Sequence, residues 1–130
     1  MRRGNRRANL VAALAAGLLL AACDSGPKGP GQLTGRMQSG PIPVGAIVLE
    51  FSGSGITGFS GSGSTRVFFS ERASGVFRVV LVTPTPGEIA FQISVDDLEA
   101  PLPAVTVVEA VGGDNGAIAN LTGIAVEVKP

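Results

Sequence analysis

The stretch Glu88-Ile89-Ala90-Phe91-Gln92-Ile93-Ser94-Val95 decides the fold class, because a large apolar side chain occupies every second position. Successive side chains of a β-strand point to opposite faces, so Ile89, Phe91, Ile93 and Val95 fall on one face. The segment therefore predicts a strand with one buried face and one exposed face.

Five further segments share this strand character. They are rich in β-branched residues, they mostly alternate, and turn sequences such as Thr83-Pro84-Thr85-Pro86-Gly87 separate them. Six or seven short strands at this spacing predict an all-β fold, a small antiparallel β-sandwich, over residues 44–130. The five segments are 46–51, 65–70, 76–82, 104–111 and 124–128.

The second half of the chain resembles the closing strands of cohesin-type sandwiches. The resemblance covers Gly87–Val95, the valine-rich segment 104–111, the turn Gly113-Asp114-Asn115-Gly116 and the segment Gly123–Val128. It implies an immunoglobulin-like or cohesin-like sandwich and favours a binding or assembly module. No binding motif is part of it, so it assigns no partner and no site residue.

The amino terminus has the layout of a cleaved export signal. Arg2, Arg3, Arg6 and Arg7 precede a 13-residue apolar run, Leu10 to Ala22. As a helix this run would span only about 20 Å, less than the ~30 Å hydrocarbon core of a membrane. A basic flank, a short apolar run and small residues at its end are typical of a signal peptide.

Leu20-Ala21-Ala22-Cys23 resembles the lipobox of bacterial lipoproteins. The resemblance implies that residues 1–22 are cleaved, that Cys23 carries diacylglycerol, and that the new amino terminus is acylated. It places the protein in the bacterial cell envelope, anchored to a membrane on its extracytoplasmic side, with the leaflet open. The alternative is an ordinary export signal cut near Ala22, which leaves Cys23 a free thiol.

Residues 23–43 form a lipidated, Gly/Pro-rich segment that we expect to act as a tether. Between Asp24 and Pro43 it holds five glycines and four prolines with little apolar content. Such a composition buries too little surface to offset the entropy lost on ordering. The sequence therefore predicts a flexible link between the anchor and the folded domain.

The charge balance argues against nucleic-acid binding. From Cys23 onward the chain keeps six basic residues against ten acidic ones, a net charge of −4. Neither a nucleic acid nor an anionic lipid headgroup suits such a surface. We expect no nucleic-acid partner and a membrane contact through the lipid alone.

One segment matches a phosphate-binding motif without its context. Gly53-Ser54-Gly55-Ile56-Thr57-Gly58 fits G-x-G-x-x-G after a predicted strand. That fingerprint needs a helix to begin there, whereas Phe59-Ser60-Gly61-Ser62-Gly63-Ser64 follows. We interpret residues 52–64 as a mobile glycine-serine loop, or as a hairpin that Phe59 pins to the domain.

Catalytic and metal chemistry has few candidate residues. The chain has no histidine, which excludes Ser-His and Cys-His pairs and imidazole ligands. Asp96, Asp97, Glu99 and Asp114 are candidate calcium ligands, although their spacing fits no EF-hand loop and solvated turn acids are the commoner explanation for such residues. Apart from the lipid on Cys23 and this calcium hypothesis, no cofactor is expected.

Three functional hypotheses follow. The first is a lipid-anchored, non-catalytic sandwich that binds or assembles with another envelope component through an edge strand or its loops. The second is a small-ligand or calcium-binding module that uses loops 96–99 and 113–116. The third is an enzyme, for which no nucleophile or acid-base constellation is visible.

Overall fold

Eight strands form in the part of the chain that the structure, a computed structural model, describes, residues 29–130. All-β architecture is thus confirmed, with eight strands in place of the expected six or seven. The strands are β1 (Gly31–Gln38), β2 (Val44–Ser52), β3 (Ile56–Gly61), β4 (Arg66–Ala73), β5 (Val76–Val82), β6 (Ala90–Val95), β7 (Ala104–Gly112) and β8 (Ala125–Lys129).

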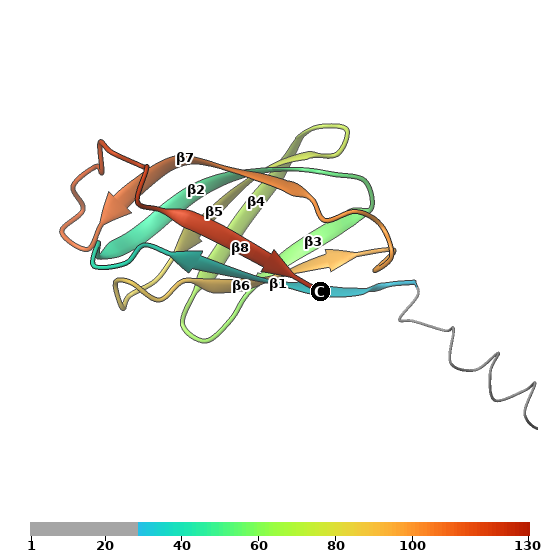
Figure 1. Cartoon of the computed structure of the whole chain (residues 1–130), viewed down its shortest axis with the longest axis horizontal. Helices are drawn as coiled ribbons and strands as arrows, with labels where there is room; N and C mark the ends of the chain where they lie inside the picture. The colour runs from blue at the N-terminus through green and yellow to red at the C-terminus, as the bar shows by residue number, and fades with distance from the viewer. Residues whose placement is uncertain (1–28) are drawn as a thin grey trace, which may run out of the picture.

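Two antiparallel sheets of four strands pack face to face, as in a β-sandwich (Figure 1). Sheet A has the order β3-β6-β1-β8, and sheet B has the order β4-β5-β2-β7. Only the turn Ser74–Gly75 joins two neighbouring strands, β4 and β5. Every other connection crosses from one sheet to the other, which ties the two layers together.

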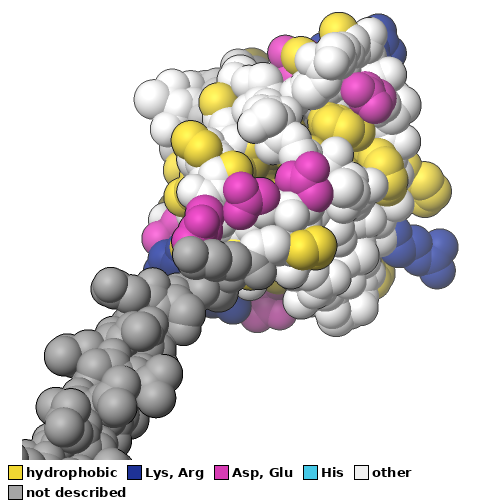
Figure 2. Space-filling view, turned by 90° about the vertical axis from the view of Figure 1, so that its right-hand side faces the viewer, with side chains coloured by type: hydrophobic (Ala, Val, Ile, Leu, Met, Phe, Trp, Pro, Cys, Tyr) yellow, Lys and Arg dark blue, Asp and Glu magenta, His cyan; other side chains and the backbone are white. Residues whose placement is uncertain are grey.

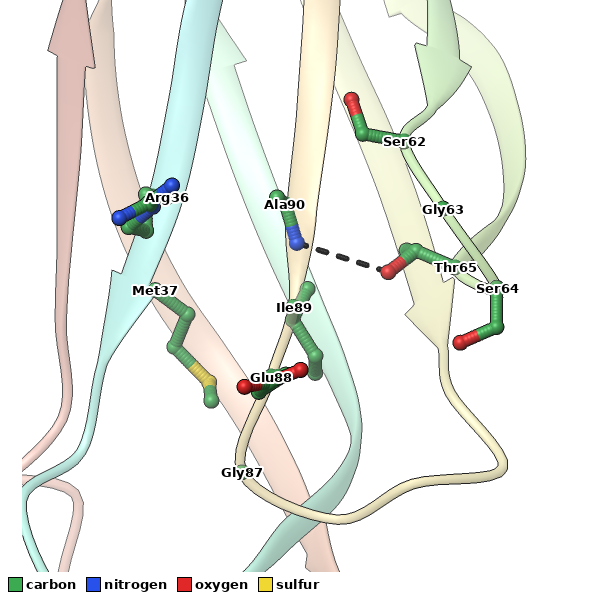
Figure 3. A pocket seen from close by; sticks show the side chains of 10 residues that line it. All are labelled: Arg36, Met37, Ser62, Gly63, Ser64, Thr65, Gly87, Glu88, Ile89 and Ala90. Atoms are coloured by element: carbon green, nitrogen blue, oxygen red, sulfur yellow. Dashed lines mark hydrogen bonds between the residues drawn. The ribbon is translucent and has the colours of Figure 1, made fainter.

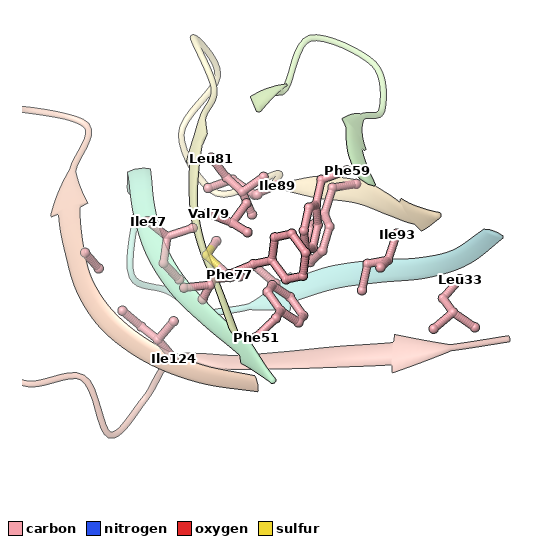
Figure 4. Packing of buried hydrophobic residues seen from close by; sticks show 14 of the residues in the cluster. Leu33, Ile47, Phe51, Phe59, Phe77, Val79, Leu81, Ile89, Ile93 and Ile124 are labelled. Atoms are coloured by element: carbon pink, nitrogen blue, oxygen red, sulfur yellow. The ribbon is translucent and has the colours of Figure 1, made fainter. Parts of the chain in front are cut away.

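The core lies between the two sheets and contains the apolar face that the alternation predicts. Phe91, Ile93 and Val95 on β6, and Ile89 directly before it, are all buried. The facing side chains come from sheet B, and Figure 4 shows Ile89 and Ile93 of the first set together with several side chains of the second. Those of sheet B that are buried include Ile47, Leu49, Phe51, Phe77, Val79 and Leu81.

Strand β1 lies within residues 23–43, which we expected to be a flexible tether, so this expectation is wrong for residues 31–38. Residues 31–38 pair with both β6 and β8, so they form an inner strand of sheet A. Leu33, Gly35 and Met37 point inward and are buried. The alternation is hard to recognise in the sequence, because one of the inward positions is a glycine, Gly35. The Phe91 ring occupies the space that a side chain at Gly35 would fill.

Strand β3 lies within residues 52–64, which we expected to be a mobile glycine-serine loop, so this expectation is wrong for residues 56–61. Residues 56–61 pair with β6 at the edge of sheet A. Phe59 is buried, and its ring centroid lies 5.2 Å from that of Phe51 and 5.6 Å from that of Phe77. Pinning by Phe59 was the correct part of the expectation, and the burial of this ring is why the segment is a strand.

The sandwich has two ends with different loops. The proximal end, where β1 begins, carries the connections 53–55, 74–75 and 96–103. The distal end carries the connections 39–43, 62–65, 83–89 and 113–124.

Within residues 29–130, no helix is long and apolar enough to cross a membrane. The expected signal peptide 1–22, Cys23 and the first part of the tether lie outside the described residues.

Candidate functional site

The outer faces of the two sheets differ in chemistry. The outward positions of sheet A are mostly polar, and the central ones are Thr34 and Arg36 on β1 and Gln92 and Ser94 on β6. An antiparallel sheet with one solvated face normally shows this pattern. The outer face of sheet A therefore looks like ordinary solvent-facing surface.

Toward the distal end of the sandwich, the outer face of sheet B is mainly apolar instead. Phe68 on β4, Val80 on β5 and Val48 on β2 lie side by side in register. In the adjacent row, Val82 on β5 pairs with Ala46 on β2. The side chain of Phe68 is 61% exposed, and that of Val82 is 37% exposed. With Val111, which pairs with Ala46 on the other side, these residues form what we call the valine face: Ala46, Val48, Phe68, Val80, Val82 and Val111.

Two adjacent phenylalanines on β4 serve opposite sides of sheet B. Phe69 is the inward neighbour of Phe68, and its ring centroid lies 5.2 Å from that of Phe59. It covers the edge at which β3 and β4 approach each other. Phe69 thus has a packing role, although it is 46% exposed, whereas Phe68 projects into solvent.

An ion pair lies across the middle of sheet B beside the valine face. Nη2 of Arg78 on β5 donates to Oε2 of Glu50 on β2 at 2.9 Å. Both side chains are about one-third to two-fifths exposed (36% and 41%). Nε of Arg78 is buried and meets no acceptor among residues 29–130. Arg66 on β4 and Glu109 on β7 add one charge of each sign toward the two edges.

A pocket of about 340 Å³ opens at the distal end (Figure 3). It lies between the end of β1, the turn 62–65 and the start of β6. Arg36 and Glu88 contribute charges, and the backbone of Ala90 donates to Thr65 Oγ1 at 3.5 Å along its wall. The pocket is polar and open to solvent, with room for a small molecule.

The four candidate calcium ligands do not come together. Asp96, Asp97 and Glu99 lie on the proximal connection 96–103, and Figure 2, which faces this end, shows acidic side chains gathered there. Asp114 lies at the distal end of the sandwich. Within residues 29–130, no group of three or more Asp, Glu, Cys or His side chains is arranged to hold a metal ion.

The acids have local roles in their turns. Oδ1 of Asp97 accepts from the backbone N–H of Glu99 at 2.9 Å, and Oδ1 of Asp114 accepts from that of Gly116 at 3.0 Å. Both are Asx turns, in which an aspartate carboxylate stabilises the loop.

The G-x-G-x-x-G segment runs from β2 into β3 with no helix. Gly55 has φ +78°, and its carbonyl accepts from the N–H of Asp96 at 2.9 Å. A Cβ at Gly55 would overlap the Asp96 carboxylate. The glycine is needed for this turn, and a carboxylate rather than a cation lies against it.

Sequence reasoning missed the valine face, although a signal for it exists. Val79-Val80-Leu81-Val82 is apolar at four consecutive positions, so β5 is apolar on both of its faces. Such runs indicate a strand covered on two sides. Here β5 has the core on one side and solvent on the other.

Comparison with known proteins yields no match: no family model, no curated protein and no solved structure matches this chain.

Proposed function

We propose that this protein is a lipid-anchored component of the bacterial cell envelope whose β-sandwich acts as a non-catalytic assembly module. The valine face is the observation that carries the assembly role. A folded domain rarely leaves a contiguous apolar surface in water without a use for it. The outer face of sheet A in the same molecule is polar, so the apolar outer surface is specific to sheet B.

The lipobox Leu20-Ala21-Ala22-Cys23 supports the anchoring part of the proposal. Since β1 begins at Gly31, only seven residues, Asp24 to Pro30, separate Cys23 from the first strand. Fully extended, they reach at most about 25 Å. Lipidation would therefore hold the proximal end toward the membrane and leave the sides of the sandwich free to contact neighbours.

Anchoring is tested by the variant Cys23→Ala. We expect the variant to lose the acyl chains, as seen by mass spectrometry of the amino-terminal peptide, and to leave the membrane fraction or remain uncut. Ser25→Ala, two residues on, is the matched control and should behave as wild type. Membrane retention of Cys23→Ala without any lipid would refute the anchor.

Assembly is tested by photo-crosslinking in intact cells. A photoreactive residue at Val80, on the valine face, should form adducts. The same residue at Ser94, at an outward position of an inner strand of sheet A, should form few. Equal adduct yields at the two positions would contradict assembly through sheet B.

Small-ligand binding is a second candidate function, and the distal pocket favours it. Because Arg36 and Glu88 both line the pocket, a zwitterion such as a free amino acid suits its charges. Titration with glycine should shift the amide resonances of 62–65 and 87–90 in wild type but not in Arg36→Gln. Shifts that survive this substitution would place binding elsewhere.

The similarity to cohesin-type sandwiches stays a prediction.

A further inference from the structure

We propose that the valine face is occupied by a second copy of this chain, in a symmetric dimer whose two-fold axis runs parallel to the strands. This inference rests on the proposed assembly function and names its partner. In this arrangement the outer faces of two B sheets meet. β5 of one copy lies over β2 of the other, and β4 lies over β7, because the rotation reverses the strand order β4-β5-β2-β7.

Charge complementarity on the central strands selects this arrangement. Arg78 on β5 and Glu50 on β2 are directly paired in the register. With β5 over β2, Arg78 of each copy faces Glu50 of the other. Four charges of alternating sign then meet at the dimer axis.

Charges nearer the edges agree with the same axis. Arg66 lies on β4 in the row of Val82 and Ala46, and Glu109 lies on β7 in the row of Val80 and Val48. Placing β4 over β7 brings them within one row, about 7 Å along the strand, which an arginine side chain spans. Opposite signs therefore meet at both edges of the interface.

The alternative two-fold axis, perpendicular to the strands, is disfavoured. It stacks β5 on β5 and β2 on β2. When the row that holds Arg78 and Glu50 lies on the axis, Arg78 therefore meets Arg78 and Glu50 meets Glu50. Like charges facing each other across an interface oppose association. The Arg78–Glu50 pair beside the valine face thus favours the axis that runs parallel to the strands.

The total area of the outer face of sheet B, polar residues included, suits a weak dimer. Four strands about 4.8 Å apart and about seven residues long, at ~3.3 Å each, present roughly 440 Å² of flat face per copy. Two copies together bury roughly 900 Å² of flat face, and protruding side chains add to this area. The total is close to the ~1,000 Å² of accessible surface expected to be buried in a specific interface. Confinement to a membrane surface raises the effective concentration and favours such a contact.

Thiol crosslinking in membranes tests the geometry. Lipidated Cys23 offers no free thiol, so Val48→Cys introduces a single reactive site next to the axis. A short bismaleimide should convert this variant to a species of twice the mass, while Ser94→Cys on sheet A should stay monomeric. Reaction of the wild-type chain would instead reveal an unmodified Cys23, which would contradict the anchor and not the dimer.

Charge reversal tests the pairing. In the Val48→Cys background, Glu50→Arg and Arg78→Glu should each lower the dimer yield about tenfold or more, because each places like charges at the axis. Co-expression of the two variants should restore the crosslink, since each then complements the other. Glu127→Arg on sheet A is the matched control and should crosslink as its parent does.

Four outcomes would overturn the second copy as partner. The first three are the absence of dimer from Val48→Cys together with a second valine-face variant, Val80→Cys; equal dimer from Ser94→Cys; and failure of the mixed charge variants to recover. Val48→Cys adducts with a different protein would also overturn it, while leaving the proposed assembly function in place.

Discussion

At the scale of single residues, Gly35 shows how a glycine can belong to a core. It pairs with Phe91 across β1 and β6, and a Cβ at Gly35 would overlap the Phe91 ring. Gly35→Ala should therefore lower the free energy of unfolding by about 1–3 kcal/mol through overpacking. Urea unfolding of the protein measures this, with Thr34→Ala, one residue before on the outer face, as the nearly neutral control. A harmless Gly35→Ala would mean that β1 is not packed on Phe91.

Phe91 itself tests the facing of β6. Its side chain is fully buried and its ring centroid lies 5.8 Å from that of Phe51. Phe91→Ala should cost about 3–5 kcal/mol of unfolding free energy, because the truncation leaves a cavity. Gln92→Ala, on the outer face, should cost under about 1 kcal/mol. Equal losses in urea melts would refute the assigned faces.

At the scale of elements, β3 decides whether residues 53–63 are replaceable. Deleting them in favour of an Asn-Gly turn removes Phe59 and exposes the edge of β6, so we expect loss of cooperative unfolding in circular dichroism melts. Phe59→Ala is the milder test and should cost about 3–5 kcal/mol. A shortened chain that folds as stably as wild type would restore the loop interpretation.

Strand β1 has a similar test. Residues 44–130, the domain that periodicity alone delimits, lack the strand between β6 and β8. Without β1, both neighbours lose a hydrogen-bonding partner and the core loses Leu33 and Met37. We expect residues 29–130 to melt cooperatively and residues 44–130 to remain largely unfolded by amide exchange. Native-like protection in the shorter chain would contradict the inner position of β1.

At the scale of the whole molecule, the separation of the two ends bears on calcium. Asp97 and Asp114 lie at opposite ends of the sandwich. If calcium changes the melting temperature at all, Asp97→Asn and Asp114→Asn should act additively on that change, because distant sites are independent. Strong coupling between the two substitutions would show a shared ion and contradict the strand arrangement.

Much of the fold is predictable from the sequence, and the exceptions share one cause. The strands around Phe51, Val79 and Phe91 alternate clearly, and their inward faces are as expected. β1 and β3 escape prediction because glycines interrupt their alternation, and composition then favours a tether and a loop. The calcium hypothesis groups residues by spacing in the sequence, which does not report at which end of a sandwich a loop lies.

The fold class and the buried face of most strands can be read from the sequence, because alternation and turn chemistry are local and act without a partner strand. The sequence also contains Leu20-Ala21-Ala22-Cys23, a linear motif whose resemblance to a lipobox needs no tertiary structure to be seen. Only the tertiary structure decided that Gly35 and Phe59 belong to the core and that Asp114 lies apart from Asp97. It alone aligns Phe68, Val80 and Val48 into one apolar face beside Arg78 and Glu50. Those relations depend on pairing between strands far apart in the chain, and no local pattern encodes which strands become neighbours.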